Sequence, residues 1–524
     1  MAGQTPGLAF PVTATAVSDK GKQGAARGGL ANMAGMALAG ATGVLVTWIV
    51  ARSLGAEQAG AFFATTAAFV LVGGLAKLGT QTGLVYWLSR LRATDRTHLL
   101  GSCLRTGLTP VILLSGLLGA GLWLAAPAVA RLTAEESPHV FAEHVLGLRV
   151  LAVFVPLSAL ADVLLTATRG YRLMRPTVML DRVLRSTLQL LLVAGAGVAA
   201  LWTTVELPMF ALAWAAPYLP VAILAAFALR NTYRAGRPDE SRTRRVERRE
   251  LRRGFWRFTA PRALASVAQL AVQRVDVLLV AALGGLAAAA VYAVAGRFVI
   301  LIQFANQGVS QSVQPRLAEA LATGDRDTAN DLYRTATGWL VLVTWPINLL
   351  VILFAPIYLG LFGEQYRAGA PVVVVLACAM LVATGCGMVD MVLAMAGRTS
   401  WNLANVLVAL ALTIGLDLLL IPRLGAMGAA LGLAGAMLAN NLLPLLQVAR
   451  HARLHPFGAG TLTAAALSVA CFGVLPRLVT AVLGHGPAAL SLALAIAVPA
   501  FCFSAWLFRE RLALTAFRFR RTPP

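Results

Sequence analysis

Residues 106–130 read TGLTPVILLSGLLGAGLWLAAPAVA, a run of 25 residues without a charged side chain. As an α-helix, this run is about 37 Å long, which is enough to cross the ~30 Å hydrocarbon core of a bilayer. It also lacks the polar face that a helix on the surface of a soluble protein needs. The segment therefore predicts a transmembrane helix.

Similar apolar runs recur along the whole chain, in which 58% of the residues are hydrophobic and only 13% are charged. Soluble globular proteins carry about 25% charged residues. The pattern predicts an all-α, polytopic membrane protein with about fourteen transmembrane helices. We expect these helices near residues 29–51, 60–88, 107–130, 141–168, 182–202, 207–229, 258–283, 288–312, 334–355, 370–395, 400–421, 427–449, 458–481 and 487–508.

The formal charge of +22 lies in short segments between the apolar runs. It therefore does not indicate a nucleic-acid partner. Alternate connections are strongly basic, whereas the others carry about one basic residue each, and this alternation predicts that both termini are cytoplasmic. The basic segments lie near residues 90–105, 169–185, 230–257, 316–334, 398, 450–453 and 509–521. They would face anionic lipid headgroups of the cytoplasmic membrane. The five cysteines show no metal-ligand spacing, so no metal and no cofactor are expected.

The chain also contains an internal repeat. Placing Leu54-Gly55 over Leu283-Gly284 aligns Phe69 with Phe298 and Gly79 with Gly308 without a gap. Six helices per half would bring both halves in from the same side, which implies parallel repeats around a pseudo-two-fold axis along the membrane normal. The expected units are residues 1–28 (cytoplasmic segment), 29–229 (first lobe), 230–257 (basic linker), 258–449 (second lobe), 458–508 (two further helices) and 509–524 (cytoplasmic tail).

Residues 396–432, AGRTSWNLANVLVALALTIGLDLLLIPRLGAMGAALG, resemble the signature of the polysaccharide-exporting flippases. That family belongs to the multidrug, oligosaccharidyl-lipid and polysaccharide exporter superfamily. Two other segments, residues 51–63 and 273–299, resemble the first loop of the family and its seventh-to-eighth helix unit. The resemblance covers roughly residues 28–450. It implies two six-helix lobes around a central cavity, often followed by two more helices.

The resemblance also implies an activity, the movement of undecaprenyl-diphosphate-linked oligosaccharides to the outer leaflet for cell-surface polysaccharide synthesis. A diphosphate and a hydrated glycan need a polar, preferably cationic, path through an apolar slab. Alternating access of a cationic cavity between the lobes would supply that path. The expected partners are the lipid-linked substrate, anionic lipids and a polysaccharide polymerase or glycosyltransferases.

Polar side chains inside the expected helices are candidates for this path because ionisable residues are costly in the membrane. At about 100° per residue, Arg262, Ser266, Gln269, Gln273 and Asp276 lie within an arc of about 80° on one helix face. This stripe would line the cavity or, alternatively, form hydrogen bonds between helices. Arg274 lies off the stripe and would contact the cavity, reach another helix or snorkel outward.

Three more positions are candidate substrate contacts. Gln303 and Gln307 share a helix face and would bind sugar hydroxyls or connect helices. Arg297 lies near mid-depth, where an unpaired charge needs water, an anion or a partner. Lys77 is the only lysine within an expected helix. It would be a cavity cation or snorkel towards the cytoplasm.

Three aspartates, Asp162, Asp276 and Asp390, are candidates for ion coupling. Asp162 and Asp390 occupy matching places in the two halves, each followed by an arginine, Arg169 and Arg398. Structural ion pairs within each helix are the alternative for these two aspartates. Asp417 lies near the outer end of its helix and would be interfacial.

Other functions are compatible with parts of the pattern. A peptidoglycan lipid II flippase and a multidrug exporter share the expected fold, although the intramembrane cations favour an anionic substrate. A membrane glycosyltransferase or polysaccharide polymerase needs catalytic groups on a sizeable loop or domain, and the outer loops here are short. A non-transporting scaffold would not need the polar stripes. The sequence therefore predicts a transporter and not an enzyme.

Overall fold

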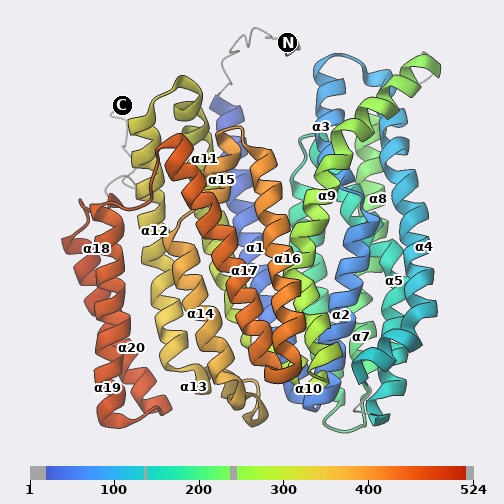
Figure 1. Cartoon of the computed structure of the whole chain (residues 1–524). Helices are drawn as coiled ribbons and strands as arrows, with labels where there is room; N and C mark the ends of the chain where they lie inside the picture. Colours follow the sequence, from blue (N-terminus) through green and yellow to red (C-terminus); the bar gives the residue numbers. More distant parts are fainter. Residues whose placement is uncertain (1–18, 135–137, 236–244, 515–524) are drawn as a thin grey trace.

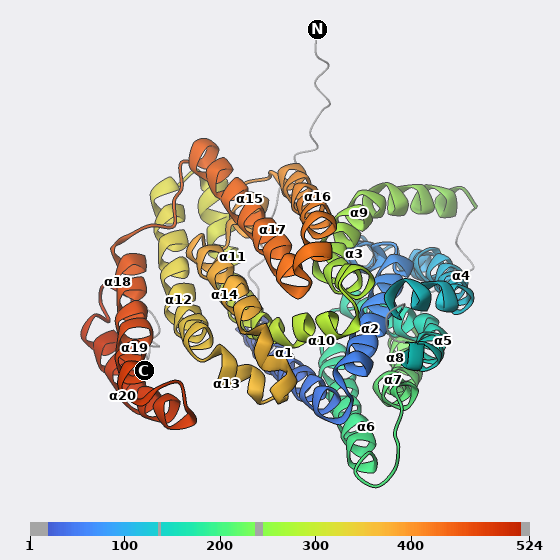
Figure 2. The same cartoon turned by 60° about the horizontal axis from the view of Figure 1, so that its bottom comes forward.

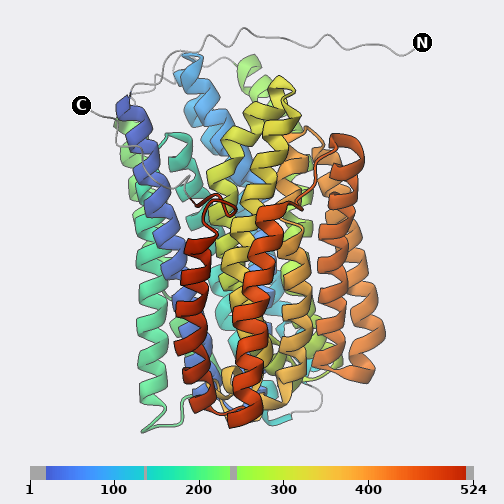
Figure 3. The same ribbon diagram turned by 90° about the vertical axis from the view of Figure 1, so that its left-hand side faces the viewer.

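A computed structural model describes residues 19–134, 138–235 and 245–514, and these residues form helices and no strand. Fourteen helical segments in them are long and apolar enough to cross a membrane, as the sequence predicts. Most of the expected cytoplasmic segment 1–28, part of the linker 230–257 and most of the tail 509–524 lie outside the described residues. Helix α1 starts and α20 ends at the same end of the bundle (Figures 1 and 3).

The first lobe runs from α1 to α8. Its helices are α1 (Asp19–Ser53), α2 (Ala56–Ala76), α3 (Thr80–Ala93), α4 (Leu100–Ala134), α5 (Pro138–Gly170), α6 (Ser186–Ala199), α7 (Leu207–Ala215) and α8 (Tyr218–Ala235). A π-helical segment, η2 (Thr177–Arg185), leads into α6. This lobe is held together by packing of α4 on α5, of α5 on α8 and of α1 on α6.

The second lobe runs from α9 to α17. Its helices are α9 (Arg245–Leu283), α10 (Leu286–Ala295), α11 (Arg297–Thr323), α12 (Arg326–Leu353), α13 (Ala355–Gly360), α14 (Ala370–Gly385), α15 (Val389–Met395), α16 (Thr399–Leu424) and α17 (Ala426–Gln447). A 3₁₀ turn, η4 (Glu364–Gly369), precedes α14. Asp325 caps α12 by accepting a hydrogen bond from the Thr328 N–H, which lowers the pKa of the Asp325 carboxyl.

Two further membrane spans follow the lobes. They comprise α18 (Ala459–Ser468), the π-helical η6 (Val469–Val474), α19 (Leu475–Leu483) and α20 (Pro487–Leu507). They lie at the outside of the second lobe, where α18, η6 and α19 contact α12 (Figures 1 and 2). The predicted fold class, two six-helix lobes plus two C-terminal helices, is therefore confirmed.

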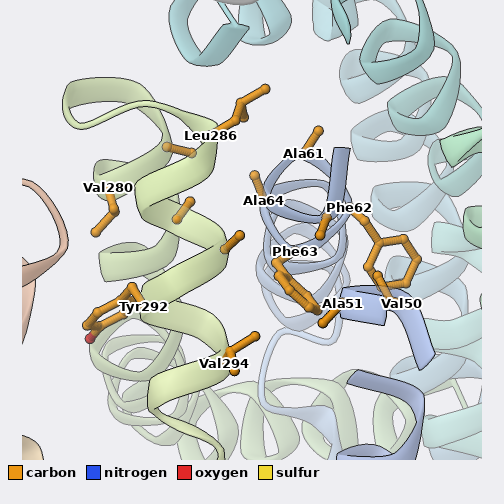
Figure 4. Close-up of a cluster of buried hydrophobic side chains, with 14 of the residues drawn as sticks. Val50, Ala51, Ala61, Phe62, Phe63, Ala64, Val280, Leu286, Tyr292 and Val294 are labelled. Carbon is orange, nitrogen blue, oxygen red and sulfur yellow. The ribbon is translucent and has the colours of Figure 1, made fainter. Parts of the chain in front are cut away.

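The predicted repeat coincides with equivalent turns in the two lobes. In the first lobe, α1 ends at Ser53 and α2 starts at Ala56; in the second, α9 ends at Leu283 and α10 starts at Leu286. Helices α2 and α10 then pack directly against each other across the lobe junction (Figure 2). Their small and aromatic side chains join one buried apolar cluster (Figure 4).

The two lobes are also joined by hydrogen bonds near the C-terminal end of α1. The Trp48 Nε1–H and the Arg52 Nε–H both donate to the Leu361 carbonyl, at 2.7 and 3.2 Å. The Tyr366 hydroxyl donates to the Ala51 carbonyl at 3.4 Å. The lobes are thus fastened at the end of the bundle opposite to the start of α1.

Helix α9 contacts both lobes. It packs on α2, α3 and α4 of the first lobe and on α10 and α16 of the second. Glycines permit the first set of contacts. A Cβ atom at Gly79 would lie 2.6 Å from the Ala263 Cα, and one at Gly74 would lie 1.9 Å from Leu270 Cδ2. Residues 245–257 of the expected linker belong to this helix, with Leu251 and Phe255 buried against the first lobe.

Gly60 sets the separation of the lobes. A Cβ atom there would lie 1.8 Å from the Leu286 carbonyl oxygen, which is far inside van der Waals contact with rigid backbone. We therefore expect Gly60→Ala to separate α2 from α10 and to destabilise this conformation by about 1–3 kcal/mol, the usual cost of overpacking. A bismaleimide cross-link between cysteines introduced at Trp48 and Leu361 would form more slowly in this variant. Gly55→Ala, where a Cβ meets nothing within 4 Å, is the control. Equal cross-linking in both variants would contradict the prediction.

Candidate functional site

Two arginines of the second lobe, Arg274 on α9 and Arg297 at the start of α11, lie within electrostatic range of each other. The Nε atom of each is buried without a hydrogen-bond partner. Neither side chain forms an ion pair with a carboxylate among the described residues. An unpaired guanidinium at the centre of a membrane helix costs about 3 kcal/mol, so this arrangement has unsatisfied capacity for an anion or water.

The arginine pair lies where the two lobes meet. The Arg297 guanidinium carbon lies 5.6 Å from the centre of the Phe63 ring on α2. Arg297 also interacts electrostatically with Tyr358 of α13. Arg274 interacts electrostatically with Asp276 of its own helix and with Tyr218 of α8. Both lobes therefore contribute to the surroundings of the two charges. The two positive charges therefore lie at the junction of the lobes.

Lys77 forms an ion pair with Asp162. Its ammonium donates a hydrogen bond to Asp162 Oδ2, and about a quarter of each side chain is exposed. The chain breaks its helix here, because Leu78 and Gly79 adopt positive φ values of 49° and 63° between α2 and α3. The alternative, an ion pair between Asp162 and Arg169, does not form. Arg169 instead donates a hydrogen bond to the Thr166 hydroxyl at 2.5 Å.

The Lys77–Asp162 pair belongs to a larger polar network that sequence reasoning missed. Asp162 interacts electrostatically with Arg185. Arg185 in turn pairs with Asp181 at 2.8 Å, donates to Gln189 Oε1 at 3.0 Å and lies over the Tyr218 ring at 5.4 Å. We expected Arg185 in a cytoplasmic connection. The i,i+4 spacing of Asp181 and Arg185 was the available signal for their pairing.

Asp276 is buried at the end of the α9 stripe. It accepts a hydrogen bond from the Tyr292 hydroxyl at 2.5 Å and one from the Val277 N–H at 2.8 Å. Asp417 lies within electrostatic range of Asp276. Asp417, which we expected near the membrane interface, has a fully buried side chain, and neither of its carboxylate oxygens has a hydrogen-bond partner among the described residues. Two close, buried carboxylates would require a proton or a cation.

The other stripe residues are accessible. Arg262, Gln269 and Gln273 are exposed on α9, whereas the neighbouring Ala268 is buried. Gln303 and Gln307 are exposed on α11. None of these four glutamines forms a hydrogen bond among the described residues, so they do not connect helices in this conformation.

Asp390 differs from its counterpart Asp162. Its carboxylate is exposed and forms no ion pair with Arg398 in the part of the chain that the structure describes. Its backbone carbonyl accepts a hydrogen bond from Asn402 Nδ2 at 2.9 Å. Arg398 instead lies 5.0 Å from the Trp401 ring centre. Within residues 19–134, 138–235 and 245–514, no three His, Cys, Asp or Glu side chains are placed to hold a metal ion.

Comparison with known proteins places this geometry in a transporter fold. Residues 261–419 match the MatE family model. The structure is similar to the lipid II flippase MurJ in an inward closed conformation, with 14% identity and a TM-score of 0.70 over 93% of this chain and 99% of that chain. No curated protein sequence matches the chain.

Two structures of a multidrug resistance MATE family transporter of the MOP superfamily give a further comparison. An inward-facing one has 17% identity and a TM-score of 0.62, covering 80% of this chain and 94% of that chain. An outward-facing one has 17% identity and a TM-score of 0.52, covering 85% and 96%. The chain thus has the fold of MOP-superfamily transporters.

Proposed function

We propose that this protein is a flippase that moves a polyprenyl-diphosphate-linked oligosaccharide across the cytoplasmic membrane, with undecaprenyl diphosphate as the carrier. The observation that carries the proposal is the pair of half-buried arginines, Arg274 and Arg297, which form no ion pair among the described residues and lie at the junction of the lobes. A diphosphate supplies the missing negative charge, and Arg can bind it through two parallel N–H···O bonds. The exposed glutamines of α9 and α11 would bind sugar hydroxyls.

The same observation weighs against a cationic drug as substrate. Two unpaired guanidinium groups would repel a cation, and that repulsion is poorly screened in a partly dehydrated site. The similar folds named above are those of transporters and not of enzymes, which supports the absence of an enzymatic activity. The buried Asp276–Tyr292 pair and the neighbouring Asp417 are the side chains that we propose for ion coupling.

The proposal is tested with purified, full-length protein in liposomes. The protein should move a polyprenyl-diphosphate oligosaccharide between the leaflets, measured by the access of an added glycosidase to the glycan. No new glycosidic bond should form and none should be broken by the protein alone. Vesicles that contain the Arg297→Gln variant serve as the control. Formation of glycosidic linkages would replace the flippase with an enzyme, and an immobile substrate would end the proposal.

A peptidoglycan lipid II flippase is the second candidate. It is favoured by the similarity to the lipid II flippase MurJ, which extends over almost the full length of both chains. The same liposome assay, run with lipid II and with the lipid-linked oligosaccharide in turn, separates the two candidates. We expect faster movement of the oligosaccharide, and faster movement of lipid II would reverse the assignment.

We also propose that both termini and the α8–α9 connection are cytoplasmic, because the basic connections lie on that side of the bundle. In a variant without native cysteines, a cysteine introduced at Ser241 should react with an impermeant maleimide only after cells are permeabilised. A cysteine at Arg131, at the opposite end of the bundle, should react in intact cells. Labelling of residue 241 in intact cells would invert the topology.

A further inference from the structure

A stack of two aromatic rings with an arginine at each end joins α3 to α9. The Tyr86 ring of α3 lies parallel to the Phe258 ring of α9, with centroids 4.1 Å apart and an interplanar angle of 16°. The Arg262 guanidinium carbon lies 3.8 Å from the Phe258 ring centre. At the other end, Arg90 Nη1 donates to the Tyr86 hydroxyl at 3.0 Å.

Both arginines of this stack are fixed in place and free to bind an anion. Arg262 and Arg90 are exposed, and neither forms an ion pair with a carboxylate among the described residues. Arg262 also donates one hydrogen bond to the Phe258 carbonyl at 3.0 Å. Stacking occupies the face of a guanidinium and leaves N–H groups at its edge, which is where phosphate oxygens bind. Because stacking already restricts the Arg262 side chain, binding of a ligand costs less conformational entropy.

The stack lies at the cytoplasmic level of the proposed path. Arg262 precedes Leu283, the last residue of α9, by 21 positions, which corresponds to about 30 Å of helix, roughly one hydrocarbon thickness. Phe258 and Arg262 lie on the same face of α9 as Gln269 and Gln273. Arg274 follows Arg262 by 12 positions, or about 18 Å along the axis.

We infer that Arg90, Tyr86, Phe258 and Arg262 form an entry site that binds the diphosphate of a polyprenyl-linked substrate at the cytoplasmic mouth, before it reaches Arg274 and Arg297. This inference rests on the proposed flippase function. The two arginines bind the phosphates, and the aromatic pair holds the arginines apart. The polar residues between the two arginine sets, Ser266, Gln269 and Gln273, connect this site to the central one. An ordinary interfacial aromatic belt is the alternative, in which the rings contact lipid headgroups in general.

The first test separates binding from translocation. The double variant Arg90→Gln/Arg262→Gln should raise the KM for lipid-linked oligosaccharide about tenfold in the liposome assay, because two charge-assisted hydrogen bonds are lost before the central site is reached. Arg297→Gln should instead lower the maximal rate. Phe258→Leu should raise the KM as the double variant does, whereas Phe258→Tyr, which keeps the aromatic ring, should have the wild-type KM. The matched control is Arg92→Gln, on the same helix, whose guanidinium lies against Tyr171 outside the stack. An unchanged KM in the double variant would overturn the entry site while leaving the flippase intact.

The second test does not depend on transport. Full-length protein in phosphatidylcholine nanodiscs is titrated with geranylgeranyl diphosphate, and the affinity should fall about tenfold in the double variant but not in Arg92→Gln. If the double variant loses affinity but the wild-type protein does not transport, the binding site is supported and the flippase proposal fails. If phosphatidylglycerol in the nanodisc competes as well as the diphosphate, the stack is a general headgroup site and the inference fails. Geranylgeraniol, which lacks phosphate, should not bind there.

Discussion

Replacing Arg297 with glutamine is expected to abolish transport and, at the same time, to raise the thermal stability of the protein. The side chain is a half-buried cation whose Nε atom is buried without a hydrogen-bond partner, and Arg274 adds a second positive charge nearby. Removing one charge relieves their repulsion and the cost of burial. The loss of a buried arginine–phosphate contact costs several kcal/mol, which corresponds to at least a hundredfold loss in transport rate. Initial rates in liposomes and the melting temperature in detergent measure the two effects.

The opposite signs of these effects separate a functional charge from a structural one. Arg149→Gln is the matched control, because Arg149 also has a buried Nε without a partner but lies against Trp123 of α4, within the first lobe. We expect this variant to transport normally. Arg297→Lys should keep part of the activity if charge alone is needed, and little if the guanidinium fork is needed. A destabilised and inactive Arg297→Gln would mean that the charge only supports folding, and an active one would remove Arg297 from the path.

Replacing Lys77 with methionine is expected to destabilise the first lobe by about 3 kcal/mol. Asp162 would then lose its ion-pair partner and keep only the longer-range interaction with Arg185. Removing one partner of a buried pair typically costs 3–5 kcal/mol, and the partial exposure of both side chains places this pair at the lower end. The double variant Lys77→Met/Asp162→Leu should recover most of the loss. Thermal unfolding of the four proteins of this double-mutant cycle measures the coupling.

Transport by the same variants then shows whether the pair also has a role in the cycle. A stable double variant that no longer transports would mean that the lysine contacts substrate or that the carboxylate takes part in coupling. Lys77→Arg should keep the pair and much of the activity, because it keeps the charge. If Lys77→Met were as stable as the wild type, the pair would contribute nothing to folding, and the structural interpretation of this contact would be wrong.

The two halves of the structure show how far local sequence signals extend. Apolar runs determine the helices because every backbone polar group in lipid must be satisfied within its own segment. The repeat around Leu54 and Leu283 follows from the same signal, since equivalent turns interrupt equivalent runs. The helix break at Lys77–Gly79 has no counterpart in α11, where Asn306 matches Lys77, so the repeat did not reveal it.

For the candidate site, too, local sequence signals predict some features and tertiary contacts set the others. The apolar runs and the polar residues within them indicate which positions carry polar groups inside the membrane, and the helical period predicts that Arg262, Gln269 and Gln273 share a face. Their partners follow from the packing of the helices, which pairs Lys77 with Asp162, leaves the Nε atoms of Arg274 and Arg297 without a hydrogen-bond partner and buries Asp417. The reason is physical. The cost of exposing an apolar residue or burying a charge depends on the local environment, so it can be judged from the sequence of a single helix. An ion pair depends on which helices pack together. That packing is set by contacts between residues far apart in the chain, such as Gly60 against Leu286.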